Sequence, residues 1–168
     1  MSQDLVSSAP GIYQALLSLV QTAAAAQKPA PIQVFPFELG QYEPGSYVTL
    51  HAIENHTFEW AYIGPFSQYE HYDVVGCATV FTGDTVTSGT VATDVLSQTY
   101  SLFQTLVMTP VMSNRNMPIF NTTGPTPYLM LPEYARYSAG PGEIGGNPGG
   151  WVGVIESAYH FDALVTPA

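Results

Sequence analysis

The sequence predicts an α+β domain in which a mainly antiparallel sheet is covered on one face by two helices. Three observations support this prediction: an alternating stretch over residues 57–84 that is typical of a β-hairpin, two stretches with apolar residues at helical spacing, and a final alternating run from Trp151 to Leu164. The chain has 168 residues, of which 46% are hydrophobic, enough for one core. We therefore expect a single domain over residues 1–168.

The predicted hairpin organises the rest of the fold. Its first arm alternates Phe58, Trp60 and Tyr62, and turn-forming residues follow at 64–68. Alternation places one set of side chains on a buried face and the other set on the opposite face, so the hairpin can seed an antiparallel sheet. On the second arm, one face carries Tyr72, Val74, Gly76, Ala78 and Val80, and the other carries Asp73, Val75, Cys77, Thr79 and Phe81.

An amphipathic helix is predicted near the N-terminus, after a short tail over residues 1–7. Ser8 can cap this helix, Pro10 lies where a missing N–H does no harm, and Pro29 ends it. Its apolar residues form one stripe: Ile12, Leu16, Leu19, Val20 and Ala23.

Two short strands are predicted before the hairpin, at residues 31–35 and 47–53, with a loop over residues 37–46 between them. In the second strand the alternation puts Val48, Leu50 and Ala52 on one face. The other face then carries Tyr47, Thr49, His51 and Ile53.

After the hairpin, a second helix is predicted from Thr90 to Pro110. Its broad apolar stripe, able to lie across a sheet, comprises Val91, Val95, Leu96, Leu102, Phe103, Leu106 and Val107. Turn-forming residues then predict an irregular crossing at 113–127 and a short strand at 128–131. The Gly/Pro-rich stretch at 138–150 predicts a long loop, and such loops are often functional or mobile.

The composition narrows the class of function. Three Lys+Arg against thirteen Asp+Glu give a net charge of −10, which argues against binding to a nucleic-acid backbone. Only 10% of residues are charged, which suits a subunit packed against neighbours; the alternative is a monomer with a Ser/Thr-rich surface. The single Cys77, the lack of a long apolar run and the lack of a basic N-terminal region predict a soluble intracellular protein without disulfides.

No catalytic or cofactor motif stands out in the sequence. The four histidines, at positions 51, 56, 71 and 160, have neither helical spacing nor cysteine partners, so we expect solvent-facing strand residues and no metal. A nucleophile elbow and the two phosphate-cradling glycine patterns are absent. We therefore expect no cofactor and no enzyme activity.

Two sugar-directed alternatives stay open. A glycoside hydrolase needs two carboxylates beside aromatic residues, and Glu59, Glu70, Asp73 and Glu156 are candidates, although Glu59 and Asp73 fit solvent-face strand positions. A non-catalytic sugar-binding module would use Trp60 and Trp151 as stacking platforms. The alternation instead favours core positions for both tryptophans.

The order of these segments resembles that of the tail terminator proteins of long-tailed bacteriophages, particularly phages of actinobacteria. The resemblance covers roughly residues 8–112 and 150–165. Besides the N-terminal helix, it rests on Pro31-Ile32-Gln33-Val34-Phe35, Tyr47-Val48-Thr49-Leu50, Trp60-Ala61-Tyr62-Ile63-Gly64, Tyr69-Glu70-His71-Tyr72-Asp73-Val74 and Gly83-Asp84 before a helix.

The resemblance implies a structural virion protein at the tail-neck junction. Proteins of that family form a six-membered ring on the last ring of the tail tube, stop its growth and present the surface to which the connector of the filled head attaches. The implied partners are copies of the same chain, the major tail tube protein and the head-tail connector proteins, with genomic DNA passing through the lumen unbound and no membrane. Another neck or tail-tube component and a carbohydrate-binding tail-tip module are the alternatives.

A subunit interface is expected around the few cations. Arg115 and Arg136 are two of three cations in the chain, and they would pair with Glu38, Glu43 or Glu143 of a neighbouring subunit; the alternative is that both are solvated. Tyr134 and Tyr137 flank Arg136 and suit interface anchors. The hypothesis predicts that Arg136→Glu weakens ring assembly while the fold stays intact.

Overall fold

The computed structural model describes most of the chain, with short gaps between elements. The described residues are 7–28, 31–37, 39, 45–60, 68–82, 89–114, 128–144 and 147–165. The predicted positions Glu38, Glu43 and Arg115 and most of the predicted crossing at 113–127 lie outside these residues.

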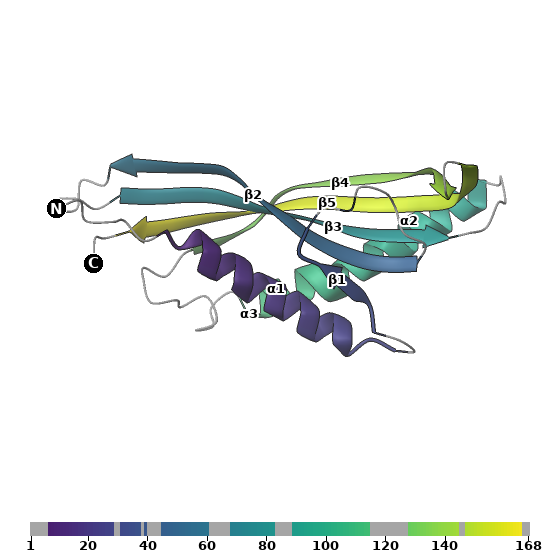
Figure 1. Ribbon diagram of the computed structural model, residues 1–168, viewed down its shortest axis with the longest axis horizontal. Helices are drawn as coiled ribbons and strands as arrows, with labels where there is room; N and C mark the ends of the chain where they lie inside the picture. Colours follow the sequence, from purple (N-terminus) through teal and green to yellow (C-terminus); the bar gives the residue numbers. More distant parts are fainter. Residues whose placement is uncertain are drawn as a thin grey trace.

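Five strands form one mostly antiparallel sheet in the order β1-β2-β3-β5-β4. Only β1 runs parallel to its neighbour, β2. The strands extend along the long axis of the molecule, and the helices lie on one side of the sheet (Figure 1). The α+β prediction is thereby confirmed. The strand bounds are β1 Gln33–Phe35, β2 Gly45–Trp60, β3 Gln68–Thr82, β4 Tyr128–Ile144 and β5 Asn147–Val165.

The predicted hairpin is confirmed as the antiparallel pair of β2 and β3, but its first arm is longer than expected. The separate strand predicted at 47–53 is the beginning of β2, which continues to Trp60. A register shift between Leu50 and Ala52 also places Ala52 opposite Val75 and Ile53 opposite Val74. The predicted faces of Ala52 and Ile53 were therefore wrong, because strict alternation cannot anticipate a bulge.

The Gly/Pro-rich loop predicted at 138–150 is wrong, because most of this stretch is paired strand. β4 continues through it to Ile144, and β5 begins at Asn147, with Gly140 opposite Val152 and Glu143 opposite Pro148. The short strand predicted at 128–131 is likewise the start of the 17-residue β4. Proline is tolerated here because β4 is an edge strand and Pro148 is the second residue of β5, where a missing N–H costs little.

The first helix, α1, spans Ala9–Ala25, close to the prediction. Its buried residues recur at three and four positions and face the sheet. It packs against β1, β2 and the later helical segments. The buried residues of α1 are Ala9, Ile12, Leu16, Leu17, Val20 and Ala24.

The second predicted helix is one helical segment in three parts: α2 (Gly89–Phe103), a π turn η1 (Gln104–Met108) and α3 (Thr109–Asn114). The predicted end at Pro110 was therefore four residues early. The ring of a helical proline clashes with the carbonyl of the residue four positions earlier, here Leu106. Leu106 lies in the wider π turn, and a π turn is one of the places where a helix accommodates a proline ring.

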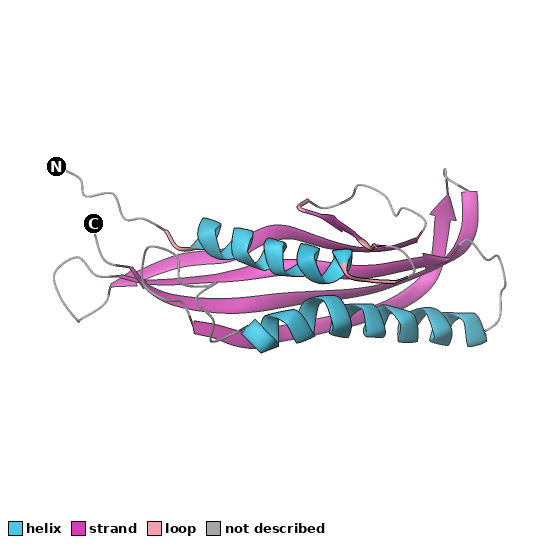
Figure 2. Cartoon of the chain, turned by 90° about the horizontal axis from the view of Figure 1, so that it is seen from below, coloured by secondary structure: helices cyan, strands magenta, loops and turns pink. Residues whose placement is uncertain are grey.

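Both helical segments pack on the same face of the sheet, side by side along the strands (Figure 2). Gly153 of β5 permits the close approach of α2, because a Cβ at that position would lie 2.4 Å from Thr99 Oγ1 and 2.9 Å from Val95 Cγ1. The face covered by helices is called the helix face below, and the opposite face the open face. The core on the helix face includes Leu16, Val48, Leu50, Tyr72, Val74, Phe103, Leu106, Ile155, Tyr159 and Phe161.

Candidate functional site

A group of polar side chains lies at the end of the β2–β3 pair that contains the end of β2 and the beginning of β3, called here the distal hairpin (residues 54–60 and 68–73). A β-bulge in β2 leaves Asn55 and His56 without pairing partners on β3 between Glu54 and Thr57. Asn55 has φ +51°, a conformation that Asn tolerates better than most residues. Its side chain and that of His56 reach different carboxylates, Asp73 and Glu70 respectively. A single bulge thus supports two polar sites, one on each face.

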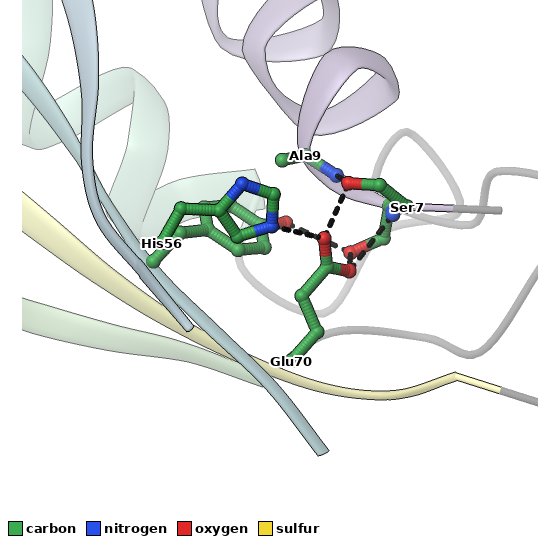
Figure 3. Close-up of polar contacts among 6 residues, drawn as sticks. Ser7, Ala9, His56 and Glu70 are labelled. Atoms are coloured by element: carbon green, nitrogen blue, oxygen red, sulfur yellow. Dashed lines mark hydrogen bonds and ion pairs between the residues drawn. The ribbon is translucent and has the colours of Figure 1, made fainter. Parts of the chain in front are cut away.

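On the helix face, Glu70 binds the beginning of α1. Glu70 is fully buried, and Figure 3 shows its carboxylate between the first turn of α1 and His56. Its Oε2 accepts hydrogen bonds from the Ser8 backbone N–H at 2.8 Å and the Ser8 hydroxyl at 2.7 Å. Its Oε1 accepts from the Ser7 hydroxyl and from His56 Nε2, the latter at 2.7 Å. Each oxygen of this buried anion therefore accepts two hydrogen bonds.

These contacts explain the charge state of Glu70. Burial raises the pKa of the carboxyl, but the hydrogen bonds from Ser7, Ser8 and His56 together outweigh burial and hold its pKa below the usual value. The helix N-terminus also favours a negative charge. Ser8 does stand at the predicted N-cap position, but its side chain makes no capping bond within the helix. Ser8 donates to Glu70 through both its hydroxyl and its backbone N–H, and the Ser7 hydroxyl accepts a hydrogen bond from the Ala9 backbone N–H at 3.2 Å.

On the open face, two histidines and two aspartates form what is called here the His–Asp cluster: His71, Asp73, His160 and Asp162. The register of β3 and β5 pairs His71 with Asp162 and Asp73 with His160. His71 Nδ1 lies 2.5 Å from Asp162 Oδ1, and His160 Nδ1 lies 2.7 Å from Asp73 Oδ1. His160 Nε2 also lies 3.1 Å from Asp162 Oδ1. The two imidazole rings are stacked, with centroids 6.3 Å apart.

Within this cluster, the imidazole of His160 contacts two carboxylates, those of Asp73 and Asp162. Burial lowers the pKa of His160, but the hydrogen bonds and negative charges of Asp73 and Asp162 more than offset it, so its pKa lies above the ordinary value. Asp73 is the most enclosed member, with a side chain that is 4% exposed. Its second oxygen, Oδ2, accepts from Asn55 Nδ2 at 2.5 Å.

The expectation that Asp73 occupies a solvent-facing position was wrong, because Asp73 is buried between β2 and β5. The histidines at 71 and 160 also do not act as isolated strand residues, since the pairing of β3 and β5 joins them. The sequence does contain a signal for this cluster: His71-Tyr72-Asp73 and His160-Phe161-Asp162 repeat the pattern His-x-Asp. Two such patterns on antiparallel neighbours meet when their registers are reciprocal.

The outer part of β2 forms an exposed surface with a large apolar content. All eight residues from Ile53 to Trp60 are exposed, whereas β1 pairs with β2 only at Tyr47, Val48 and Thr49. Trp60 is 68% exposed and Phe58 is 45% exposed. The expected core position of Trp60 was therefore wrong. Within the described residues, β2 has no strand partner on its outer edge beyond Thr49.

The predicted interface residues that fall in the described part of the chain lie along β4, at one edge of the sheet. Tyr134 pairs in register with Ala158, Arg136 with Glu156, and Tyr137 with Ile155. Glu143 lies near the end of β4, opposite Pro148. These four positions share one strand, whereas their predicted partners Glu38 and Glu43 lie outside the described residues.

The sequence matches no protein-family model, and no curated protein matches it significantly. In the part of the chain that the structure describes, no helix has both the length and the apolar character needed to cross a membrane.

Proposed function

We propose that this protein is a structural subunit of a bacteriophage virion, a tail terminator without enzymatic activity. In this proposal a hexameric ring of the chain caps the tail tube at the tail-neck junction, ends elongation and joins the tail to the head connector. The motif order described above supports the family. The α+β fold, with helices on one face of a mainly antiparallel sheet, is consistent with the sheet-and-helix domain that forms the ring in that family.

The observation that carries the proposal is the exposed edge of β2. A long unpaired strand edge with apolar side chains offers backbone donors and acceptors to another chain, and proteins that stay monomeric normally protect such edges. Here Ile53, Phe58 and Trp60 are exposed along that edge. β4 occupies the opposite edge of the sheet. Ring closure requires two different, complementary surfaces on each subunit, and the two sheet edges supply two.

The charge of the chain is consistent with a DNA conduit. A net charge of −10 repels phosphates, so DNA could pass through a ring lumen without adhering to it. The low charged fraction, 10%, fits a subunit whose surface is largely covered by neighbours. Both properties are equally compatible with another neck or tail-tube component.

One observation favours a second candidate, a carbohydrate-binding module of a tail tip. Trp60 is 68% exposed, and an exposed indole can serve as a stacking platform for a sugar ring. Binding of soluble oligosaccharides by the isolated protein, lost in Trp60→Ala, would favour this candidate.

The decisive experiment is electron microscopy of particles assembled without this protein. A terminator predicts tails of uncontrolled length beside unattached, DNA-filled heads. Joined particles with tails of normal length but poor adsorption would contradict the terminator proposal and support the tail-tip module. Joined particles that adsorb normally would contradict both.

A further inference from the structure

We propose that His71, His160 and Asp162 bind one divalent transition-metal ion of the zinc class on the open face of the sheet. This site is independent of the proposed virion function. One candidate ligand atom from each of the three residues lies within 4.8 Å of the other two. Such spacing lets three atoms surround a single ion at ordinary metal–ligand distances of about 2.0–2.2 Å after small side-chain adjustments.

The chemistry of the three donors selects the class of ion. Two imidazole nitrogens and one carboxylate oxygen suit Zn²⁺ and its first-row neighbours, whereas Mg²⁺ and Ca²⁺ prefer oxygen ligands alone. His71 Nδ1 and His160 Nε2 both approach the same oxygen, Asp162 Oδ1, at 2.5 and 3.1 Å. A bound metal ion would take the place of the direct contacts between these nitrogens and Asp162. Water can complete the coordination as a fourth ligand.

Asp73 supplies the support that metal-binding histidines usually have. A ligating imidazole commonly donates its other N–H to a carboxylate, which fixes the tautomer and ring orientation. Asp73 Oδ1 lies 2.7 Å from His160 Nδ1, which leaves Nε2 of the same ring directed at Asp162. Asn55 in turn holds the other Asp73 oxygen at 2.5 Å. The buried Asp73 is therefore a positioning residue for His160 and not a ligand.

The charge and accessibility of the site are also suitable. With neutral imidazoles, Asp73 and Asp162 contribute two negative charges, which one divalent cation balances. The side chains of His71 and His160 are each 28% exposed and that of Asp162 is 36% exposed, so an ion can enter from solvent. The bound ion would join β3 to β5, whose cluster residues are far apart in the sequence.

The alternative is a metal-free network in which protonated imidazoles balance the same carboxylates. The metal site and the metal-free network can be distinguished with the untagged protein after a chelator has removed its metals. Isothermal titration with Zn²⁺ alone should give one ion per chain, and Zn²⁺ should raise the thermal unfolding midpoint. Titration with Co²⁺ should give visible absorption typical of nitrogen and oxygen ligands.

His71→Gln and Asp162→Asn are the test variants, because both side chains are partly exposed and their loss should leave the fold intact. Each should weaken Zn²⁺ binding at least about 100-fold, and Asp73→Asn should weaken it about 10–100-fold. His51→Gln is the matched control, since His51 contacts Thr49 and lies outside the cluster. Absence of Zn²⁺ binding by the folded wild-type protein at millimolar concentration would overturn the proposal. So would binding that both test variants retain, or that the control loses equally.

Discussion

At the scale of single residues, Glu70 shows how a buried charge can organise a fold. A carboxylate removed from water is costly unless donors replace its hydration. Glu70 has a donor from His56 on the neighbouring strand and donors from Ser7 and Ser8, which are more than 60 positions away in the sequence. Glu70 therefore fixes the point at which α1 begins on the sheet.

Replacing Glu70 with Gln should destabilise the protein by about 2–4 kcal/mol, because an amide group would present its own N–H to donors that are already buried. Urea unfolding of the two proteins measures this difference. Glu59→Gln is the matched control, since Glu59 is exposed and should change stability by less than about 0.5 kcal/mol. Equal stabilities of the wild type and Glu70→Gln would contradict the assigned role.

The lowered pKa of Glu70 also predicts a pH dependence. A group whose pKa is lower in the folded state stabilises that state fully above its unfolded pKa, about 4.3 for Glu, and loses this effect as the pH falls through the folded pKa. The stability difference between wild type and Glu70→Gln should therefore shrink as the pH is lowered below about 4. Unfolding midpoints of both proteins across the acid range test this. A difference independent of pH would show that Glu70 does not titrate as expected.

At the scale of elements, the position of α2 depends on the small size of Gly153. A Cβ there would lie 2.4 Å from Thr99 Oγ1 and 3.2 Å from the Val95 carbonyl oxygen. Thr99 is fully buried, and its hydroxyl donates to that carbonyl at 2.7 Å, so neither atom can move freely. The helix and the sheet are therefore in contact at backbone distance.

Gly153→Ala should push α2 away from β5 and destabilise the protein by about 1–3 kcal/mol. Gly140→Ala is the control, because a Cβ at Gly140 meets nothing within 4 Å. Denaturant midpoints and near-ultraviolet circular dichroism of the two variants would separate a packing effect from a general effect of adding a methyl group to a strand. Equal midpoints for the two variants would mean that α2 adjusts without cost.

At the scale of the whole molecule, the two edges of the sheet differ. The β2 edge is exposed and apolar near Phe58 and Trp60, whereas β4 carries the predicted interface positions Tyr134, Arg136 and Tyr137. In the proposed ring, each subunit would present one edge to a neighbour on either side.

Trp60→Ala should leave the isolated chain equally stable, because the indole is largely exposed, but should weaken ring assembly by about 2 kcal/mol, roughly 30-fold. Sedimentation of the purified protein and complementation of assembly in infected cells measure the two effects. Tyr100→Ala is the control, since Tyr100 is an exposed aromatic residue on α2, away from this edge. Unchanged assembly by Trp60→Ala would remove Trp60 from the interface.

Arg136→Glu is predicted to weaken ring assembly with the fold intact. The register adds a confounding factor, because Arg136 pairs with Glu156 of β5 and the change would put two acidic residues at paired positions. The double variant Arg136→Glu with Glu156→Arg restores opposite charges within the subunit. If the double variant folds normally and still fails to assemble, Arg136 acts between subunits. Normal rings from both variants would contradict that role.

The parts of the fold that the sequence predicts are those with local periodicity. The β2–β3 hairpin and the apolar stripes of both helices follow from alternation and helical spacing alone. The β4–β5 hairpin was missed because glycine and proline outweigh the weak alternation of residues 138–150, and its pairing with β3 is not a local property.

The polar sites depend on contacts between distant segments. His71 and Asp162 are 91 positions apart, and Asp73 and His160 are 87 apart. Their association follows from strand register, which a single sequence does not specify before the strand order is known. The bulge at Asn55–His56 was equally invisible, because no residue pattern distinguishes it from a regular strand.

That bulge also limits how the chain can evolve. Asn55 and His56 together oppose the single Tyr72, so deleting one of them would remove the bulge and leave a regular strand with Thr57 still opposite His71. The one residue left opposite Tyr72 can face only one side of the sheet, so Glu70 and Asp73 could not both keep a donor from this point of β2. Substitutions that keep a nitrogen donor at these two positions can accumulate one at a time, but a change in length cannot. Descendants of this sequence should therefore preserve the spacing through the bulge more strictly than the identity of its residues.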